Sequence, residues 1–268
     1  MEFFWQNYIP YPVIFSLGPI SVRWYGLILV LAIIAAALVV ARYLLKNSIL
    51  DKNQLEDFTF YTVIFSLIGA RFGHVVFFNF SYYMRNLDEV IQVWNGGMSI
   101  QGAVLFGLIT VIIWARKHKV SFWKLADAIV PGLALGQAIG RWGNYFNQEL
   151  FGKPVEWGIP IEFANREYPY LKQEYFHPTF FYESVLNFSL FLVLFFILRK
   201  GKLKPGIVAM IYFISYAVIR FFMEFVRIDI TPIVLGLRMP QFISILAIVA
   251  VLVYMFAFYL RPLPKSQK

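Results

Sequence analysis

Two arginines lie inside long apolar segments, where a charged side chain is costly and therefore indicates function. Arg220 is flanked four residues away on each side by Tyr216 and Glu224, so a helix would place all three on one face. Either Arg220 and Glu224 form an ion pair that only neutralises two charges, or the arginine faces an outer cavity. In a cavity its planar guanidinium would be a good ligand for phosphate oxygens. Arg71 is the second such arginine, and its role as catalytic residue, structural residue or lipid ligand stays open.

The strongest local pattern lies in the middle of the chain, between Gly140 and Gly152. An arginine, two asparagines and a glutamate occur within nine residues, as Arg141, Asn144, Asn147 and Glu149. A polar helix end with a glycine-rich exit is a common feature of proteins. Such a cap does not need all four of these groups, so the pattern favours a functional site.

Two further polar groups stand where apolar segments begin, and each has a structural alternative. Residues 95–103 include Gln101 and two adjacent glycines, Gly96 and Gly97, which indicate a tight turn or a backbone that a ligand approaches closely. The second group contains His177, Thr179 and Glu183. Thr179 can cap a helix, Glu183 can be a first-turn carboxylate, and a lone His177 is more often structural than catalytic.

The composition indicates that these groups are positioned in a lipid environment. Of the 268 residues, 60% are apolar and only 15% are charged, whereas soluble domains carry about a quarter charged residues. The net charge of +9 comes from basic residues at the ends of apolar segments, which suits lipid head groups and argues against a nucleic-acid partner. The chain has no cysteine and three scattered histidines, so we expect no disulfide, no metal site and no cofactor.

Seven apolar segments are long enough to cross a bilayer as helices. They lie at 22–45, 57–78, 98–115, 124–140, 179–198, 206–225 and 241–260. The fourth is short and contains Pro131, which is tolerated where a helix lines a cavity. We therefore predict an all-α integral membrane protein, with residues 1–268 forming one polytopic domain of about seven helices.

Basic residues in the connections predict the orientation of the chain. Alternate connections and the C-terminal tail hold fourteen lysines and arginines, and the opposite side holds eight. The N-terminus should then face outward and the C-terminus the cytoplasm. The connection 141–177 is long, polar and rich in glycine, proline and aromatic residues, so we expect it to form a small extracytoplasmic cap over the site.

Together these segments resemble the prolipoprotein diacylglyceryl transferase family over essentially the whole chain. Residues 140–152 are similar to the family signature Gly-Arg-x-Gly-Asn-(aromatic)-x-Asn-x-Glu-x-x-Gly. The other segments that match the family are Trp24-Tyr25-Gly26, Gly96-Gly97-Met98-Ser99, His177-Pro178-Thr179 with Tyr182-Glu183, and Tyr216, Arg220, Glu224-Phe225 and Arg227.

The resemblance implies a reaction at the outer leaflet of a bacterial plasma membrane. Its donor is phosphatidylglycerol, its acceptor is the lipobox cysteine of a lipoprotein precursor, and it forms a thioether and releases glycerol 1-phosphate. By the same match the catalytic residues are Arg141, Arg220, Glu149 and Tyr25. The residues that bind phosphatidylglycerol are Arg141, Asn144, Gln101, Glu224, Tyr216, Asn147, Gly152 and His177.

One position departs from the family, because many members have histidine where this chain has Gln101. A glutamine can hydrogen-bond but cannot accept the thiol proton as a general base. Either this position mainly binds the head group, or another residue accepts the proton. The candidates for that role are Glu149, Glu224, His74 and His177.

Two other functions remain as alternatives. An anion transporter could use Arg71, Arg141 and Arg220 as its binding site, although we detect no internal symmetry between halves of the chain. Another enzyme of phospholipid metabolism would be expected to carry a metal-binding carboxylate cluster, which the sequence does not contain.

Overall fold

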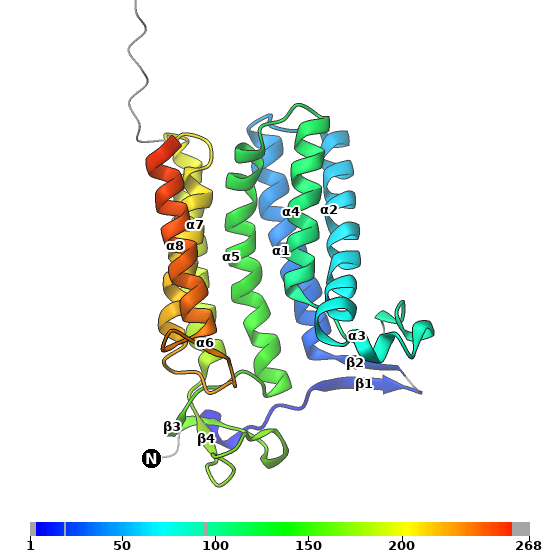
Figure 1. Ribbon diagram of the computed structural model, residues 1–268, viewed down its shortest axis with the longest axis vertical. Helices are drawn as coiled ribbons and strands as arrows, with labels where there is room; N and C mark the ends of the chain where they lie inside the picture. The colour runs from blue at the N-terminus through cyan, green and yellow to red at the C-terminus, as the bar shows by residue number, and fades with distance from the viewer. Residues whose placement is uncertain (1–3, 19, 94–95, 259–268) are drawn as a thin grey trace, which may run out of the picture. The chain divides into compact units, whose positions relative to one another are not determined.

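The computed structural model describes residues 4–18, 20–93 and 96–258, and most of these residues are helical. The long helices are α1 (Trp24–Lys46), α2 (Lys52–Gly73), α4 (Ile100–Lys117), α5 (Phe122–Asn147), α6 (Thr179–Lys200), α7 (Ile207–Met223) and α8 (Met239–Phe258) (Figure 1). The short helices are η1 (Phe4–Asn7), the π-helical turn η2 (His74–Phe78), α3 (Phe80–Tyr83), η3 (Leu87–Glu89) and η5 (Phe163–Asn165). The strands are β1 (Val13–Leu17), β2 (Ile20–Arg23), β3 (Pro154–Pro160), β4 (Tyr175–Phe176), β5 (Ile233–Val234) and β6 (Leu237–Arg238).

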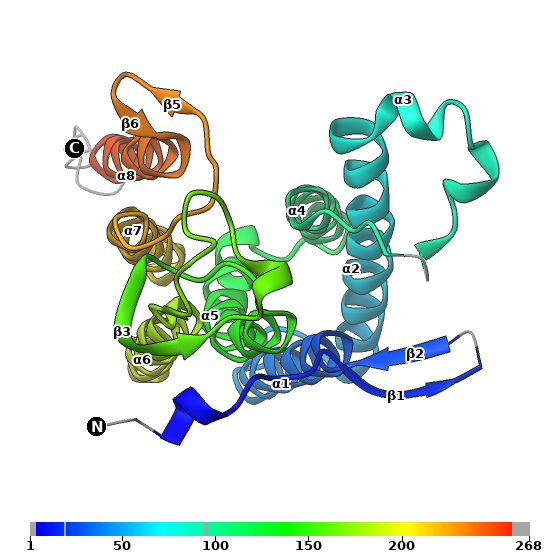
Figure 2. The ribbon, with the colours of Figure 1, turned by 90° about the horizontal axis from the view of Figure 1, so that it is seen from below.

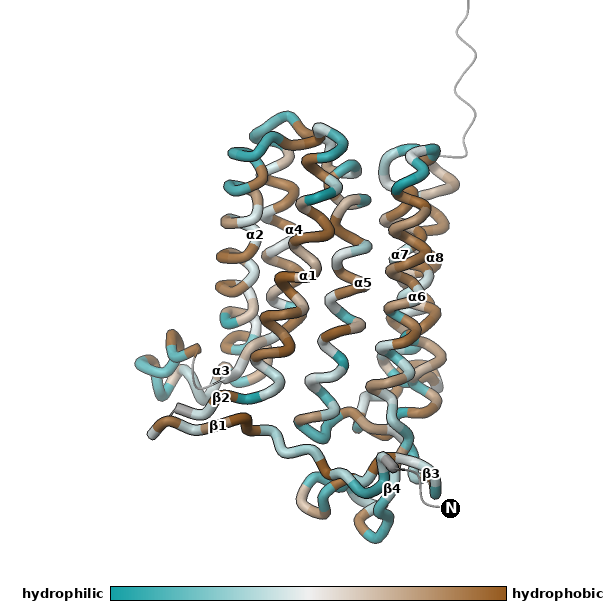
Figure 3. Tube along the Cα trace, turned by 180° about the vertical axis from the view of Figure 1, so that it is seen from behind, coloured by the Kyte–Doolittle hydropathy of each residue, from teal (hydrophilic) through white to brown (hydrophobic). Residues whose placement is uncertain are grey.

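The prediction of a mostly helical membrane protein is confirmed. Within the described residues, five helices are long and apolar enough to cross a membrane: Trp24–Lys46, Lys52–Phe78, Ile100–Lys117, Thr179–Lys200 and Met239–Ala257. The helix α7 is apolar but has only 17 residues, and α5 has 26 residues with a more polar composition. Figure 3 shows hydrophobic residues along the middle of the helices, with hydrophilic residues gathered at their ends and along part of α5.

The helix α5 extends seven residues beyond the segment predicted at 124–140. It ends at Asn147, so the first seven residues of the predicted connection 141–177 are helical, and most of the signature is not a loop. Packing explains the extension, because Trp24 stacks on Phe146 with ring centroids 4.9 Å apart and the Trp142 indole donates to Ser184 Oγ over 3.2 Å.

The described chain divides into two compact units. The first comprises Met1–Val39 and Ile129–Lys268, and the second comprises Val40–Ala128. In the second unit, α2 and α4 pack closely through small residues. A Cβ added at Gly73 would lie only 2.9 Å from the Cα of Gly102. Small residues allow this approach in membrane proteins, where close van der Waals packing drives helix association.

In the first unit, α6, α7 and α8 pack in sequence and α1 packs against α5. Two short hairpins, β1–β2 and β5–β6, are antiparallel. The β5–β6 hairpin connects α7 to α8, as Figure 2 shows. The strands β3 and β4 pair antiparallel and cover a small hydrophobic core. The buried members of this core are Phe151, Ile159, Ile161 and Phe176.

Candidate active site

The first unit contains a buried carboxylate near the start of α6. This residue, Glu183, is only 3% exposed and is the one acidic residue of a mostly apolar helix. One of its oxygens forms an ion pair with Arg141 of α5, and the other lies 2.9 Å from Nη1 of Arg227, which follows α7. Arg227 is itself 2.7 Å from the carboxylate of Asp229. The expectation of Glu183 as a simple first-turn carboxylate is therefore corrected, because helix packing surrounds it with two arginines.

Side-chain bonds between α5 and α6 fix the position of this carboxylate. The Ser184 hydroxyl accepts from Trp142 and donates to the carbonyl of Ala138 over 2.8 Å. Thr179 does not cap α6 with its side chain, because its hydroxyl donates instead to the carbonyl of Leu150. These bonds hold the first turns of α6 against the end of α5.

A second buried carboxylate, Glu224, also stands between two arginines. The predicted pair with Arg220 is present, with Nη2 of the arginine 3.0 Å from the carboxylate. The other oxygen of Glu224 lies 2.9 Å from Nε of Arg238 at the end of the β5–β6 hairpin. Tyr216, one turn before Arg220, stacks on Tyr212 with ring centroids 5.9 Å apart.

The polar residues of the signature form a chain of contacts that leads to Glu183. Arg141 donates to the side-chain oxygen of Asn144 over 3.3 Å, and Asn144 donates to Glu149 over 2.8 Å. Asn147 lies at 3.5 Å from the same carboxylate oxygen. The spacing of three residues between Arg141 and Asn144 places both on one face of α5, so the amide can orient the guanidinium.

Tyr25 lies against the same part of α5. Its ring packs over Gly143, where an added Cβ would lie 2.7 Å from a ring carbon. Its neighbour Trp24 stacks on Phe146. Tyr25 is 37% exposed, so it presents a partly accessible phenol beside the signature.

Backbone hydrogen bonds around Gly152 and His177 join the cap to the residue pair that precedes α6 and to the segment after α7. The backbone N–H of Gly152 donates to the carbonyl of His177 over 3.0 Å, and that of Lys153 donates to Val226 over 2.9 Å. The imidazole Nδ1 of His177 lies 3.1 Å from the hydroxyl of Tyr182. Burial, and then the nearby Lys153 ammonium, lowers the pKa of His177, so the ring is neutral at pH 7.

We expect Gly152→Ala to destabilise the protein and to reduce activity. The added Cβ would lie 2.8 Å from Cβ of His177, 2.9 Å from Thr179 Cγ2 and 2.9 Å from Val226 Cγ1. Such overpacking costs about 1–3 kcal/mol of unfolding free energy. Gly140→Ala is the matched control, because nothing lies within 4 Å of its added Cβ. Thermal unfolding in detergent measures both variants, and an equal loss in the two would contradict this explanation.

Three residues singled out in the sequence belong to the second unit. Gln101 is exposed, and its side-chain oxygen accepts from the Ser99 hydroxyl over 2.9 Å. The imidazole of His74 lies 3.0 Å from the side-chain nitrogen of Asn79. Arg71 is only 7% exposed and donates to backbone carbonyls of one connection. These carbonyls belong to Glu89, Val90, Gly96 and Gly97, at 2.5–3.0 Å.

This arrangement favours the structural alternative for Arg71, since its guanidinium holds the connection before α4. The absence of a side chain at Gly97, the second residue of the glycine pair, leaves room for the guanidinium. A Cβ added at Gly97, whose φ is +74°, would lie 2.8 Å from Nη1 of Arg71. The sequence predicted a tight turn or a close approach by a ligand at these glycines, and in the structure the group close to Gly97 is the Arg71 side chain.

Comparisons with known proteins show the family of this chain. The profile of the family described as Prolipoprotein diacylglyceryl transferase matches residues 12–257. The chain belongs to this family. A relative from Thermosynechococcus vestitus, named phosphatidylglycerol–prolipoprotein diacylglyceryl transferase, is 38% identical over 94% of this chain and 95% of its own. Relatives of the same name from Synechococcus elongatus and a Nostoc species are 40% and 38% identical, over 89% and 95% of this chain and 84% and 92% of their own.

The structure adds three residues to the predicted site, and two of them, Glu183 and Arg227, lie in segments that match the transferase family. Glu183, Arg227 and Arg238 complete the ion pairs of Arg141 and Arg220. Glu183 had a sequence signal, because it is the only charged residue between 179 and 198. No sequence pattern indicated Arg238, since it follows a short connection without periodic spacing of apolar residues.

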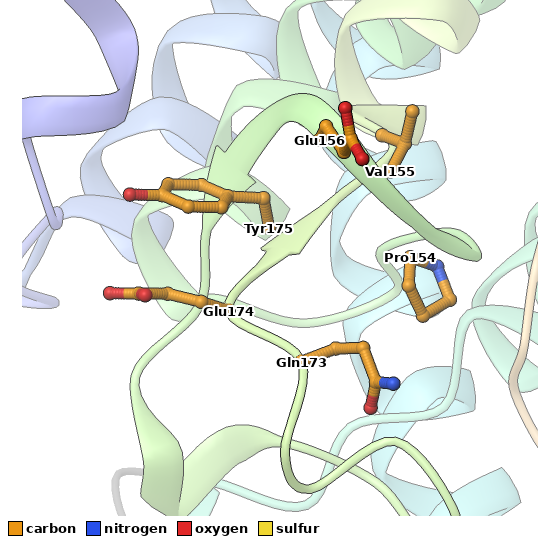
Figure 4. A pocket seen from close by; sticks show the side chains of 6 residues that line it. All are labelled: Pro154, Val155, Glu156, Gln173, Glu174 and Tyr175. Carbon is orange, nitrogen blue, oxygen red and sulfur yellow. The ribbon is translucent and has the colours of Figure 1, made fainter. Parts of the chain in front are cut away.

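The hollow shown in Figure 4 is separate from this site. It lies on the cap and is lined by Pro154, Val155, Glu156, Gln173, Glu174 and Tyr175. None of these six residues belongs to the transferase signature or to the two groups of ion pairs.

Proposed function

We propose that this chain transfers the diacylglyceryl group of phosphatidylglycerol to the lipobox cysteine of lipoprotein precursors. Membership of the transferase family and the names of its relatives support the reaction. The relatives named above are transferases, so the alternative of an anion transporter has no support among them. The single observation that carries the proposal is the placement of Arg141 and Arg220. Their side chains are 19% and 21% exposed, and each is held by a nearly or fully buried glutamate.

The reaction suits two arginines whose guanidinium groups are already oriented. The substrate thiolate attacks the glyceryl carbon, a sulfur–carbon bond forms, and the carbon–oxygen bond to phosphate breaks. Glycerol 1-phosphate leaves with one more negative charge than the diester carried. Arg141 and Arg220 stabilise this charge as it develops. Nη1 of Arg220 is buried and has no hydrogen-bond partner among the described residues, so it would donate to a phosphate oxygen once the side chain turns toward the donor.

The remaining signature residues would orient the donor and the reacting groups. Glu149 and Tyr25 act beside Arg141, where Asn144 links the glutamate to the guanidinium. The family match further assigns eight residues to binding the head group of phosphatidylglycerol. These are Arg141, Asn144, Asn147, Gly152, His177, Tyr216, Glu224 and Gln101.

The same proposal places the enzyme in a bacterial plasma membrane, as one polytopic domain of residues 1–268. We count α5 and α7 as spans with the five apolar helices, which gives seven. The polar residues of α5 support its inclusion, because a helix that lines a site need not be apolar on every face. The basic connections favour an outward N-terminus and a cytoplasmic C-terminus. The site would then face the outer leaflet beneath a cap formed by 141–177.

We expect Gln101→His to retain activity. The family resemblance implies histidine at this position in many members, and an imidazole can replace the amide as a hydrogen-bond partner of Ser99. The Gln101 side chain is exposed, so the larger ring has room in the second unit. Initial rates of peptide modification measure the effect. Complete loss in a folded variant would show that the surroundings of Gln101 differ from those in the family.

The proposed function is tested with purified protein, phosphatidylglycerol and a synthetic lipobox peptide in detergent. The mass of the peptide should increase by one diacylglyceryl group. A peptide with serine in place of cysteine should keep its mass, because its hydroxyl is a far weaker nucleophile. An unchanged cysteine peptide, with folded protein and several anionic lipids tried, would overturn the proposal.

A further inference from the structure

Arg238 joins the β5–β6 hairpin to the buried carboxylate of Glu224. Its Nε lies 2.9 Å from Oε1 of Glu224, and its Nη1 donates to the carbonyl of Arg227 over 2.6 Å. Its Nη2 donates to the carbonyl of Asp229, and its Nε lies 3.0 Å from the Thr231 hydroxyl. Arg238 therefore contacts both the charge of Glu224 and the backbone that follows α7.

The burial of Glu224 makes a second cation necessary if Arg220 is to bind a phosphate. Glu224 is 1% exposed, and a buried carboxylate without a compensating cation is strongly destabilising. An arginine that turns toward a substrate phosphate weakens its pairing with its own glutamate. With Arg238 on the other oxygen, Glu224 keeps one cation while Arg220 binds the donor.

The geometry of the contacts suits such an exchange. The two oxygens of Glu224 lie at ion-pair distance from Arg220 and Arg238, yet neither makes a well-aligned hydrogen bond to a described residue. The glutamate thus holds its arginines by charge more than by directed bonds, and one arginine can move without breaking a rigid network.

The other buried carboxylate is also shared by two arginines, although there one of them, Arg227, makes a directed hydrogen bond to it. Glu183 is shared by Arg141, which is 19% exposed, and by Arg227, which is 4% exposed and also paired with Asp229. In both groups, the arginine assigned to the phosphate shares its glutamate with a second arginine. That second arginine is held by other groups as well, Arg227 by Asp229 and Arg238 by backbone carbonyls.

We propose that Arg238 is a positioning residue that keeps the charge of Glu224 compensated while Arg220 binds the phosphate of the donor. This inference rests on the proposed function. Without Arg238, Arg220 is the sole cation of a buried carboxylate, and the donor phosphate must compete with Glu224 for it. The consequence is weaker use of phosphatidylglycerol, with a smaller effect on the rate at saturating donor.

The test measures peptide modification against phosphatidylglycerol concentration for the natural chain and for variants at Arg238. We expect Arg238→Gln to raise the KM for phosphatidylglycerol about tenfold, which is within the range of coupling between contacting charged groups. Arg238→Lys should stay within about threefold, because an ammonium still compensates Glu224 although it loses the planar fork.

Repeating the measurement in a Glu224→Gln protein distinguishes charge compensation from a purely structural role of Arg238 in the hairpin. In Glu224→Gln no buried charge needs compensation, so adding Arg238→Gln should change KM by less than about twofold. Arg166→Gln is the matched control, since Arg166 also donates to backbone carbonyls, those of Ile161 and Leu171. It should leave the KM for the donor unchanged.

Two results would overturn the inference. One is an equal rise of KM for Arg238→Gln in both backgrounds, and the other is an Arg238→Lys variant as impaired as Arg238→Gln. Either would mean that Arg238 acts only by holding the backbone after α7. Failure of the proposed function is a distinct outcome, because the natural chain itself would then leave the peptide unmodified.

Discussion

Replacing Arg141 or Arg220 by alanine should lower kcat/KM by at least about 100-fold, while the protein stays folded in the membrane. Loss of one group that stabilises a developing oxyanion typically costs this much. The fold should tolerate each change, because a second arginine remains on each glutamate. Arg227 stays 2.9 Å from Glu183, and Arg238 stays 2.9 Å from Glu224.

Rates with phosphatidylglycerol and a lipobox peptide, together with gel-filtration profiles in detergent, provide the measurement. The exposed Arg85 gives a control, and Arg85→Ala should have no effect on the rate. Lysine variants at the two site positions should recover only part of the activity, because an ammonium lacks the planar fork. Full activity in both well-folded alanine variants would eliminate the idea that the two arginines hold the phosphate.

Loss of Glu183 should damage the fold as well as the reaction. Glu183→Ala removes the carboxylate that Arg141 and Arg227 share, and it leaves Arg227, which is only 4% exposed, with Asp229 as its remaining ion-pair partner among the described residues. Breaking a buried ion pair in this way costs about 3–5 kcal/mol of unfolding free energy. We therefore expect a large drop in Tm together with loss of peptide modification. Arg141→Ala, by contrast, should lose activity with a much smaller change in Tm.

Thermal unfolding in detergent, followed by the activity assay below the transition, distinguishes these two effects. Glu156→Gln is the matched control, because this carboxylate is exposed on the cap and should tolerate neutralisation. Glu183→Gln should fall between the control and Glu183→Ala, since an amide still accepts a hydrogen bond but carries no charge. A Glu183→Ala protein as stable as the natural chain would show that the two arginines find other partners.

Local properties of the chain decided most of the helices. The first apolar segment was predicted at 22–45 and is found as Trp24–Lys46, and the last was predicted at 241–260 and begins at Met239. Hydrophobic runs with charged ends are local features, so they can be read without the fold. The helix α2 starts five residues before the predicted 57, because Asp51 and Gln54 form a capping box ahead of the apolar residues.

The same holds for interactions within one helix. The Arg220–Glu224 pair followed from a spacing of four residues, and the structure contains it at 3.0 Å. The signature also indicated a site from its composition, and three of its polar residues do contact one another through Asn144. Sequence by itself thus determined the class of protein and its family, and it predicted Arg141 and Arg220 as the main arginines of the site.

Tertiary structure alone decided which charges share a partner. Glu183 meets Arg141 and Arg227 across 42 and 44 positions of sequence, and Glu224 meets Arg238 through the turn of a hairpin. Arg71 seemed equally functional in the sequence, yet the carbonyls of one connection occupy its guanidinium. No periodic pattern encodes such contacts, because they arise only when separate helices pack and bury their polar groups together.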